Sequence, residues 1–264
     1  LTSLRSKGEN ERPCYFGLAR GLGFDYHSVE PLDFNFQQPM TVPLHELEKK
    51  LASIYPIDGK NVFHLGISPW SPARLRTKFN DFEQHYAFKN NNGGMRLPHQ
   101  YAIFSILNEL KPTTIVESGV WKGVTTQLIR KVLPHADIIS IDPVCGFKKL
   151  TQHTTFCGKN FQDLKDLGLV WKDLDMSSTL LILDDHQSGF DRLKLARHFG
   201  FIHVITEDNH PFGTGDNYSL KQLWMEPEND LVIVKNNFGK ERKTISKAKH
   251  LENRKNVLEW LETY

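Results

Sequence analysis

Residues 113–126 read TTIVESGVWKGVTT, and this stretch decides the fold. Its first six residues are rich in β-branched side chains and include Glu117 next to their end, a pattern that predicts a buried strand. Gly119 and Gly123 follow, and apolar residues then recur at helical spacing in TTQLIRKVL (125–133). We therefore expect a strand, a glycine turn and a helix, which form the first unit of a parallel α/β sheet.

Short strands and helices alternate along the rest of the chain. Further strands are expected at DIISID (137–142), LLILDD (180–185), HVITED (203–208) and LVIVKN (231–236). Helices are expected over residues 43–54, 73–89, 99–110 and 188–200, and from Lys247 onward. We predict a Rossmann-like α/β domain over residues 96–264 with helices on both faces of its sheet. We expect residues 1–95 to form an N-terminal extension, irregular to about residue 40 and then helical, which shapes a ligand pocket or lid.

The composition is that of an ordinary globular protein. Hydrophobic residues make up 39%, charged residues 24%, and the formal net charge is +2, which excludes a general polyanion binder. No apolar run approaches the ~20 residues that span a bilayer. Between Lys235 and Lys255 the chain has eight Lys or Arg against two Glu. This excess indicates either a solvated helical face or attraction to an anionic partner such as an acidic glycan, a membrane surface or nucleic acid.

The cysteines and the start of the chain bear on the compartment. Cys14, Cys145 and Cys157 are odd in number and lack CxxC spacing, so we expect buried thiols and neither a zinc site nor a disulfide scaffold. The chain begins at Leu1 and shows no signal peptide. We expect a cytoplasmic protein if the chain is complete, and the lumen of the secretory pathway if an upstream anchor has been removed.

The glycine turn has the features of a nucleotide site. Gly119 permits a tight turn, Gly123 lets a ligand approach the helix start, and Glu117 lies at the carboxyl edge of the sheet where α/β proteins bind ligands. Asp142 ends the next strand, where its carboxylate can accept both ribose hydroxyls. NAD would need a GxGxxG turn for its pyrophosphate, and this turn has wider spacing and an acid instead. A cofactor with an amino acid and a sulfonium fits better, and a turn that binds no nucleotide is the alternative.

This strand–E-x-G-x-x-x-G–helix–strand–Asp pattern resembles motif I of class I S-adenosylmethionine-dependent methyltransferases, over about residues 90–236. The resemblance implies S-adenosylmethionine as cofactor, bound by residues of the turn and the next strand: Glu117, Gly119, Gly123, Thr125 and Asp142. It also implies that Gly94 and Met95 belong to a lid over the methionine end of the cofactor. Phe161, near Asp163, is a candidate for the adenine wall, with burial in the core as the alternative.

Two later strands end in acids, in Asp184-Asp185-His186 and in Glu207-Asp208. In a parallel sheet both ends lie on the same edge as the glycine turn. Carboxylates buried together need a cation or hydrogen bonds, and Mg²⁺ is the default hard divalent ion with oxygen ligands. The alternative is that these acids cap the helices that follow them.

The two acid groups, about 23 residues apart, resemble those of metal-dependent O-methyltransferases of the cephalosporin hydroxylase-like and macrolide-sugar group. The resemblance implies Asp184, Glu207 and Asp208 as metal ligands, with the choice between Asp184 and Asp185 open. Catalytic candidates are His186, Asp185 and His210, and either histidine could serve as general base or be structural. Residues 211–219 read as an active-site loop in which Asp216 or Tyr218 touches substrate, or as a surface turn.

Together these features predict a metal-assisted O-methyltransferase acting on a sugar or glycan hydroxyl, with aromatic residues of the N-terminal arm stacking on sugar rings or lying in the core. One alternative is an O-methyltransferase for a catechol-like or natural-product hydroxyl, and another is a non-catalytic Rossmann-like binding module. Nucleic acid is not an expected partner, because the chain lacks an N/D-P-P-Y/F motif. A homo-oligomer is compatible with the sequence.

Overall fold

A computed structural model of the chain describes residues 14–17, 72–89, 94–147, 149–210, 212, 217–227, 230–235 and 241–262. The helix predicted over residues 43–54, most of the aromatic arm and Asp216 lie outside the described residues. The predictions made for those segments therefore stay predictions.

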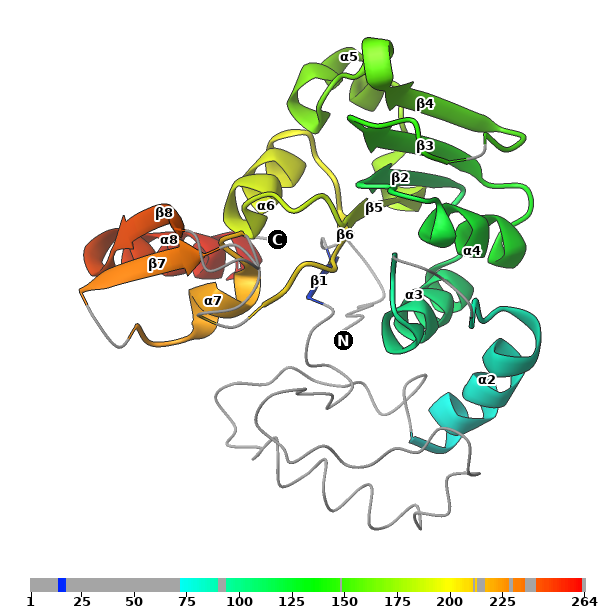
Figure 1. The fold of residues 1–264 in the computed structure, drawn as a ribbon, viewed down its shortest axis with the longest axis horizontal. Helices are drawn as coiled ribbons and strands as arrows, with labels where there is room; N and C mark the ends of the chain where they lie inside the picture. Colours follow the sequence, from blue (N-terminus) through cyan, green and yellow to red (C-terminus); the bar gives the residue numbers. More distant parts are fainter. Residues whose placement is uncertain are drawn as a thin grey trace.

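The main sheet has six parallel strands (Figure 1). They are β1 (Cys14–Gly17), β2 (Thr114–Ser118), β3 (Asp137–Asp142), β4 (His153–Cys157), β5 (Thr179–Leu183) and β6 (His203–Thr206). Their spatial order is β1-β6-β5-β2-β3-β4, so the direction of the strand order reverses between β2 and β5. This is the doubly wound arrangement of a Rossmann-like sheet, and the predicted fold class is confirmed.

Helices cover both faces of this sheet. The described helices are α2 (Pro72–His85), α3 (Leu97–Leu110), α4 (Val124–Val132), α5 (Gly168–Lys172), α6 (Gly189–His198), α7 (Leu220–Trp224) and α8 (Lys247–Glu262), with 3-10 turns η1 (Gly158–Asn160), η2 (Leu164–Asp166) and η3 (Met176–Ser178). Side chains alternate along β2: Ile115 packs with residues of α2, α3 and α4, whereas Val116 packs with α5 and α6. The result is three layers, with an apolar core on each side of the sheet.

Helix α2 belongs to the packed structure although it lies in the predicted N-terminal extension. Phe82 is fully buried, with its ring centroid 5.3 Å from that of Tyr101 and 5.4 Å from that of Phe104. The boundary predicted at residues 95 and 96 stays a prediction.

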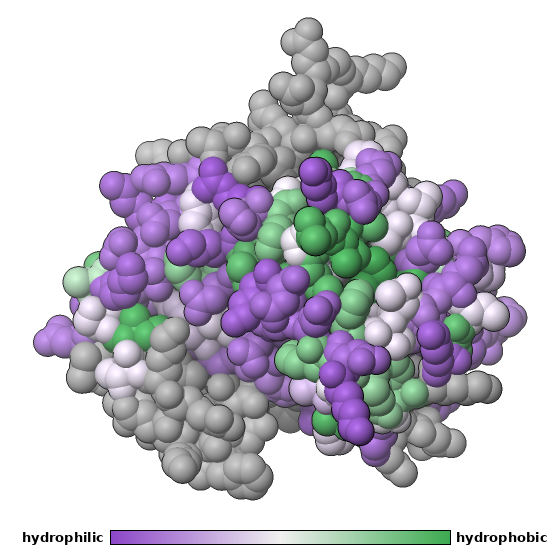
Figure 2. Space-filling model, turned by 90° about the horizontal axis from the view of Figure 1, so that it is seen from above, coloured by the Kyte–Doolittle hydropathy of each residue, from purple (hydrophilic) through white to green (hydrophobic). Residues whose placement is uncertain are grey.

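None of the described helices is both long and apolar enough to cross a membrane. The face shown in Figure 2 is mostly hydrophilic, with a smaller group of hydrophobic residues near its centre.

The strand predicted at residues 231–236 does not join the parallel sheet. It forms β7 (Leu231–Lys235), which pairs antiparallel with β8 (Glu241–Ser246) in a separate two-stranded sheet. Five residues separate the two strands, and a parallel crossover needs a dozen or more. The chain therefore makes a hairpin here, and Ile245 of β8 packs with α6, α7 and α8 in a third core cluster.

The expectation of buried thiols is wrong for two of the three cysteines. Cys145 is exposed and forms a disulfide with Cys157, with the two Cα atoms 5.3 Å apart. Strand β4 explains the pairing. Cys157 is the register partner of Asp142 at the end of β3, so it lies beside the segment that contains Cys145. The sequence analysis did not predict β4, and it therefore missed this proximity.

The turn after β2 depends on glycine at position 119. Gly119 has a φ of +88°, and a Cβ there would lie 1.8 Å from the backbone oxygen of Asp184. Gly200 also has a positive φ, +81°, but a Cβ there would meet no atom of the described residues within 4 Å. The two glycines therefore separate the effect of backbone conformation from the effect of steric overlap.

We expect Gly119→Ala to lower the free energy of unfolding by more than about 4 kcal/mol, because the overlap is with backbone that cannot rotate away. The matched control Gly200→Ala should lower it by only about 1 kcal/mol, the penalty of the left-handed conformation. Urea denaturation of both variants measures the difference. Equal losses would show that the close approach of the two chain segments is not a constraint.

Candidate functional site

The carboxyl ends of β2 and β5 meet where the strand order reverses, which is where open α/β sheets bind ligands. The register pairs Ser118 with Leu183, and Leu183 with Thr206. The residues that follow these strands, together with Glu117 and Asp142, therefore lie along one edge of the sheet. This shared edge was predicted from the sequence, and it brings the candidate cofactor and metal residues together.

Glu117 is fully buried near the end of β2. Its Oε2 accepts hydrogen bonds from the hydroxyls of Thr126 (2.7 Å) and Ser140 (3.0 Å). Its Oε1 is buried and has no hydrogen-bond partner among the described residues. Burial raises the pKa of Glu117 to about 7, although the two hydroxyl donors act in the opposite direction. A buried carboxyl oxygen without a partner is costly, and a cationic ligand group would satisfy it.

Asp142 joins the loops that follow β2 and β3. Its Oδ2 accepts the backbone N–H groups of Val120 (2.8 Å) and Trp121 (2.9 Å), and its Oδ1 accepts that of Val144 (2.7 Å). Trp121 and Val144 are 63% and 64% exposed, respectively. One carboxylate therefore fixes two loops whose apolar side chains are available to a ligand. The predicted contact of Asp142 with ribose stays a prediction.

Gly94 and Met95 lie against the start of α4. A Cβ on Gly94 would come within 3.2 Å of the Val124 side chain, which begins that helix. The Met95 side chain is buried in the core, and its backbone oxygen accepts a 2.8 Å hydrogen bond from the Gln100 side chain. The structure thus places the predicted lid residues beside the glycine turn. The Met95 side chain itself packs inward.

The other predicted cofactor residues lie around the same turn. Gly123, with a φ of +74°, immediately precedes α4, and Thr125 is buried in the first turn of that helix. Phe161, the adenine-wall candidate, follows η1 after β4 and is 41% exposed, so it is not part of the buried core.

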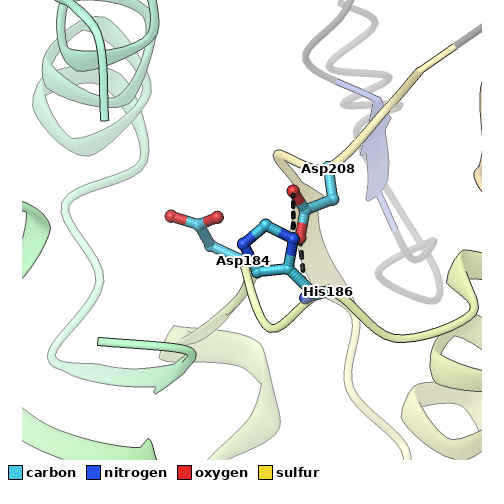
Figure 3. Close-up of side chains that lie close together, drawn as sticks. All are labelled: Asp184, His186 and Asp208. Carbon is cyan, nitrogen blue, oxygen red and sulfur yellow. Dashed lines mark hydrogen bonds and ion pairs between the residues drawn. The ribbon is translucent and has the colours of Figure 1, made fainter. Parts of the chain in front are cut away.

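Asp184, His186 and Asp208 lie close enough together to hold a metal ion (Figure 3). One potential ligand atom from each lies within 4.8 Å of the others. The backbone N–H of His186 donates a 2.7 Å hydrogen bond to Asp208, and the His186 Nδ1 lies 3.7 Å from Asp208 Oδ1. Burial, followed by the charges of Glu207 and Asp208, raises the pKa of Asp184 far above its ordinary value. A cation would relieve this crowding of carboxylates.

The group differs from the predicted ligand set, because it contains His186 and not Glu207. Glu207 lies close enough to Asp184 for its charge to raise the pKa of Asp184, and it contacts Nδ1 of His99, which lies in the first turn of α3. The sequence analysis missed His99, because its position two residues into a helix far from the acidic strand ends gives no signal. Glu207 therefore borders the group and is held from a second element.

His210, a predicted catalytic residue, lies beside Asp208. Its Nε2 is 3.6 Å from Asp208 Oδ1. Burial alone would raise the pKa of Asp208, but the contact with His210 and the charge of His186 outweigh it and lower that pKa. Asp208 is therefore the acid of this group that stays ionised most readily.

The contacts of Asp185 differ from those of Asp184. It accepts a 2.6 Å hydrogen bond from the Ser118 hydroxyl and lies 2.9 Å from Nε of Arg192. Arg192 is buried in α6 and also binds both carboxylate oxygens of Asp163, at 2.7 and 3.1 Å. Of the two neighbouring acids, Asp184 joins the candidate metal group, whereas Asp185 is held in an ion-pair network. The catalytic role predicted for Asp185 stays a prediction.

Tyr218, a predicted substrate contact, is 2% exposed, and its hydroxyl lies 2.8 Å from Nδ1 of His250 in α8. In this arrangement it links the segment before α7 to the last helix and packs in the third core cluster.

No protein-family model and no curated protein matches the chain. Solved structures match it in part. The SAH-bound Podospora anserina methyltransferase PaMTH1 is 12% identical over 51% of this chain, with a TM-score of 0.33, and the match spans 61% of its own length. The structure of cmcI-N160 with SAH is 20% identical over 65% of this chain and 78% of its own, with a TM-score of 0.36. The cmcI-D160 structure with Mg-SAM is 22% identical over 75% of this chain and 73% of its own, with a TM-score of 0.33.

Because the pKa of Glu117 is raised on folding, the free energy of unfolding should depend on pH. A carboxyl whose pKa rises from 4.5 to about 7 on folding contributes stability that is complete below pH 4.5 and is lost as the pH rises through 7. We expect Glu117→Gln to remove this loss. The variant should gain stability relative to the wild type between pH 4.5 and 7, by on the order of 3 kcal/mol.

Urea denaturation across this pH range measures the effect. Glu252→Gln, at a side chain that is 56% exposed, is the matched control and should show no such trend. A difference between wild type and Glu117→Gln that does not change with pH would contradict the assignment.

Proposed function

We propose that this chain is an S-adenosylmethionine-dependent O-methyltransferase assisted by a divalent cation. The observation that carries the proposal is that Oε1 of buried Glu117, at the strand-order reversal, has no hydrogen-bond partner within the described part of the chain. On the same edge lie Asp142 and the Asp184–His186–Asp208 group. The edge therefore offers an acceptor for an ammonium, an acceptor for a ribose and a place for a metal ion.

The residues around the glycine turn fit this cofactor. S-adenosylmethionine supplies a methyl group on a sulfonium, together with an ammonium, a ribose and an adenine. Glu117 is suited to the ammonium. Asp142 accepts two backbone N–H groups at Oδ2 and one at Oδ1, so Oδ1 can still accept one ribose hydroxyl, and the loops that it holds contain the exposed side chains of Trp121 and Val144. An acid near the end of β2 is unfavourable for a pyrophosphate, which argues against NAD.

The donor set at the strand ends fits a divalent ion. Two carboxylates, from Asp184 and Asp208, suit Mg²⁺ or Mn²⁺, and the His186 imidazole is a third donor. A cation bound there would lower the pKa of an acceptor hydroxyl. We assign Asp184, His186 and Asp208 as its ligands, with Glu207 beside them as a further oxygen donor.

The remaining side chains orient the reactants. We assign His210, which lies beside Asp208, as the group that accepts the proton of the acceptor hydroxyl. Transfer of a methyl group to oxygen needs close alignment of the two reactants, so most of the rate comes from positioning. We propose a sugar or glycan hydroxyl as acceptor. The support for it is the resemblance of the acid motifs to sugar O-methyltransferases and the aromatic composition of the N-terminal arm.

Cofactor binding is tested by calorimetric titration of the protein with S-adenosylhomocysteine, with NADH in a parallel titration. We expect binding of S-adenosylhomocysteine alone. Asp142→Asn should weaken it by about 10- to 100-fold, through loss of hydrogen bonds to a charged acceptor. Asp137→Asn, at the exposed amino end of the same strand, is the matched control and should bind normally. Binding of NADH, or of neither ligand, would refute the proposal, and the latter would favour a module without this cofactor.

Metal binding is tested with Mn²⁺, whose free concentration is read by electron paramagnetic resonance. We expect Asp184→Asn to weaken Mn²⁺ binding by about 100-fold. The neighbouring Asp185→Asn should keep most of the affinity and lose stability instead, because it breaks the ion pair with Arg192. The reverse order of effects would exchange the roles assigned to these two acids.

A further inference from the structure

Three polar residues on neighbouring strands form a continuous hydrogen-bonded row beneath the proposed cofactor site. Glu117 of β2 is the register partner of Ser140 in β3, and Ile138, two residues before Ser140, is the partner of His153 in β4. Residues two apart on a strand share a face, so all three side chains lie on the face covered by α4. All three are buried, at 0%, 0% and 6% exposure.

The direction of the hydrogen bonds along this row follows from one backbone contact. The N–H of Leu150 donates to Nδ1 of His153 at 3.2 Å, so Nδ1 carries no proton. In the neutral ring the proton is then on Nε2, which donates to the Ser140 hydroxyl at 2.8 Å. The Ser140 hydroxyl in turn donates to Oε2 of Glu117 at 3.0 Å. Every proton in the row points toward Glu117.

The surroundings of His153 keep the ring neutral. Burial, assisted by the charges of Arg130 and Lys149, lowers the pKa of His153 to about 4. The direction of the row is therefore the same throughout the neutral pH range.

The row engages only Oε2 of the Glu117 carboxylate among the contacts of the described residues. Ser140 and Thr126 both donate to Oε2, from a strand and from a helix, and together they fix the rotation of the carboxylate. Oε1 remains buried without a partner among the described residues. A carboxylate held by one oxygen presents the other in a defined direction, and this is how neighbouring groups preorganise a binding residue.

We propose that Ser140 and His153 are positioning residues, which orient Glu117 so that its Oε1 accepts the ammonium of the amino-acid part of the cofactor. This inference rests on the proposed function, because it takes the ligand to be S-adenosylmethionine or its product. It adds that recognition of the amino-acid part depends on residues of β3 and β4 that do not touch the ligand.

The experiment compares two ligands by calorimetry: S-adenosylhomocysteine, and 5′-methylthioadenosine, which has the same nucleoside and thioether but no amino acid. We expect Ser140→Ala to weaken S-adenosylhomocysteine by about tenfold, the effect of one hydrogen bond to a charged group. Binding of 5′-methylthioadenosine should not change. Ser105→Ala, the same substitution at a buried serine of α3, is the matched control and should alter neither ligand.

A second pair of variants tests the end of the row. His153→Leu removes the donor to Ser140 and should selectively weaken S-adenosylhomocysteine. His153→Gln keeps a side-chain N–H near the position of Nε2 and should restore most of the affinity. A purely structural role of these residues would not produce this dependence on the amino-acid part of the ligand.

The outcomes are distinguishable. Selective weakening of S-adenosylhomocysteine by Ser140→Ala and His153→Leu supports the inference. Equal weakening of both ligands, or no effect on either, overturns it and leaves the proposed function intact, since the wild type still binds S-adenosylhomocysteine. Failure of the wild type to bind either ligand refutes the proposed function, and this inference with it.

Discussion

The contact between the turn at Gly119 and the backbone of Asp184 is the constraint on which the rest of the site depends. With a glycine there, the chain leaving β2 passes directly against the chain leaving β5, at a separation that a single methyl group would prevent. This contact sets the distance between the residues assigned to the cofactor and those assigned to the metal. A methyl donor and its acceptor must meet within such a short distance, because transfer is fastest when the reacting atoms are already close.

Electrostatics divides the acids at the sheet edge into two kinds. Burial raises the pKa of Asp185, but Arg192 and the Ser118 hydroxyl act against this rise and favour its charged form. Asp184 instead lies among other acids, so its neighbours disfavour its charge. Compensated acids maintain the architecture, whereas acids crowded together are typical of sites that bind cations. The two neighbouring positions thus show how one strand end serves both purposes.

The sequence predicted the central strands well, because they alternate with helices and end in glycines or acids. The sequence analysis missed strands whose residues are mostly polar. Strand β4, HTTFC, has too few apolar residues to stand out, and with it the pairing of Cys157 was lost. Strand β8 contains Glu241, Arg242 and Lys243, which read as a solvated helix. For the site, the acids could be named in advance, but His99 and Arg192 could not. His99 contacts a residue 108 positions away in the sequence, and Arg192 contacts residues 29 and 7 positions away. A single sequence does not show which of these residues meet in space.

The disulfide between Cys145 and Cys157 holds an edge strand of the main sheet. Strand β4 is the last strand of the described sheet, so one side of its backbone has no neighbouring strand. An edge strand can separate from its sheet or pair with another chain, and proteins usually protect edge strands against this. Here the disulfide links the end of the edge strand β4 to the segment that follows β3. In an oxidising environment the strand is fastened in place, and a reducing environment would leave it held by hydrogen bonds and packing alone, with a greater tendency to self-association.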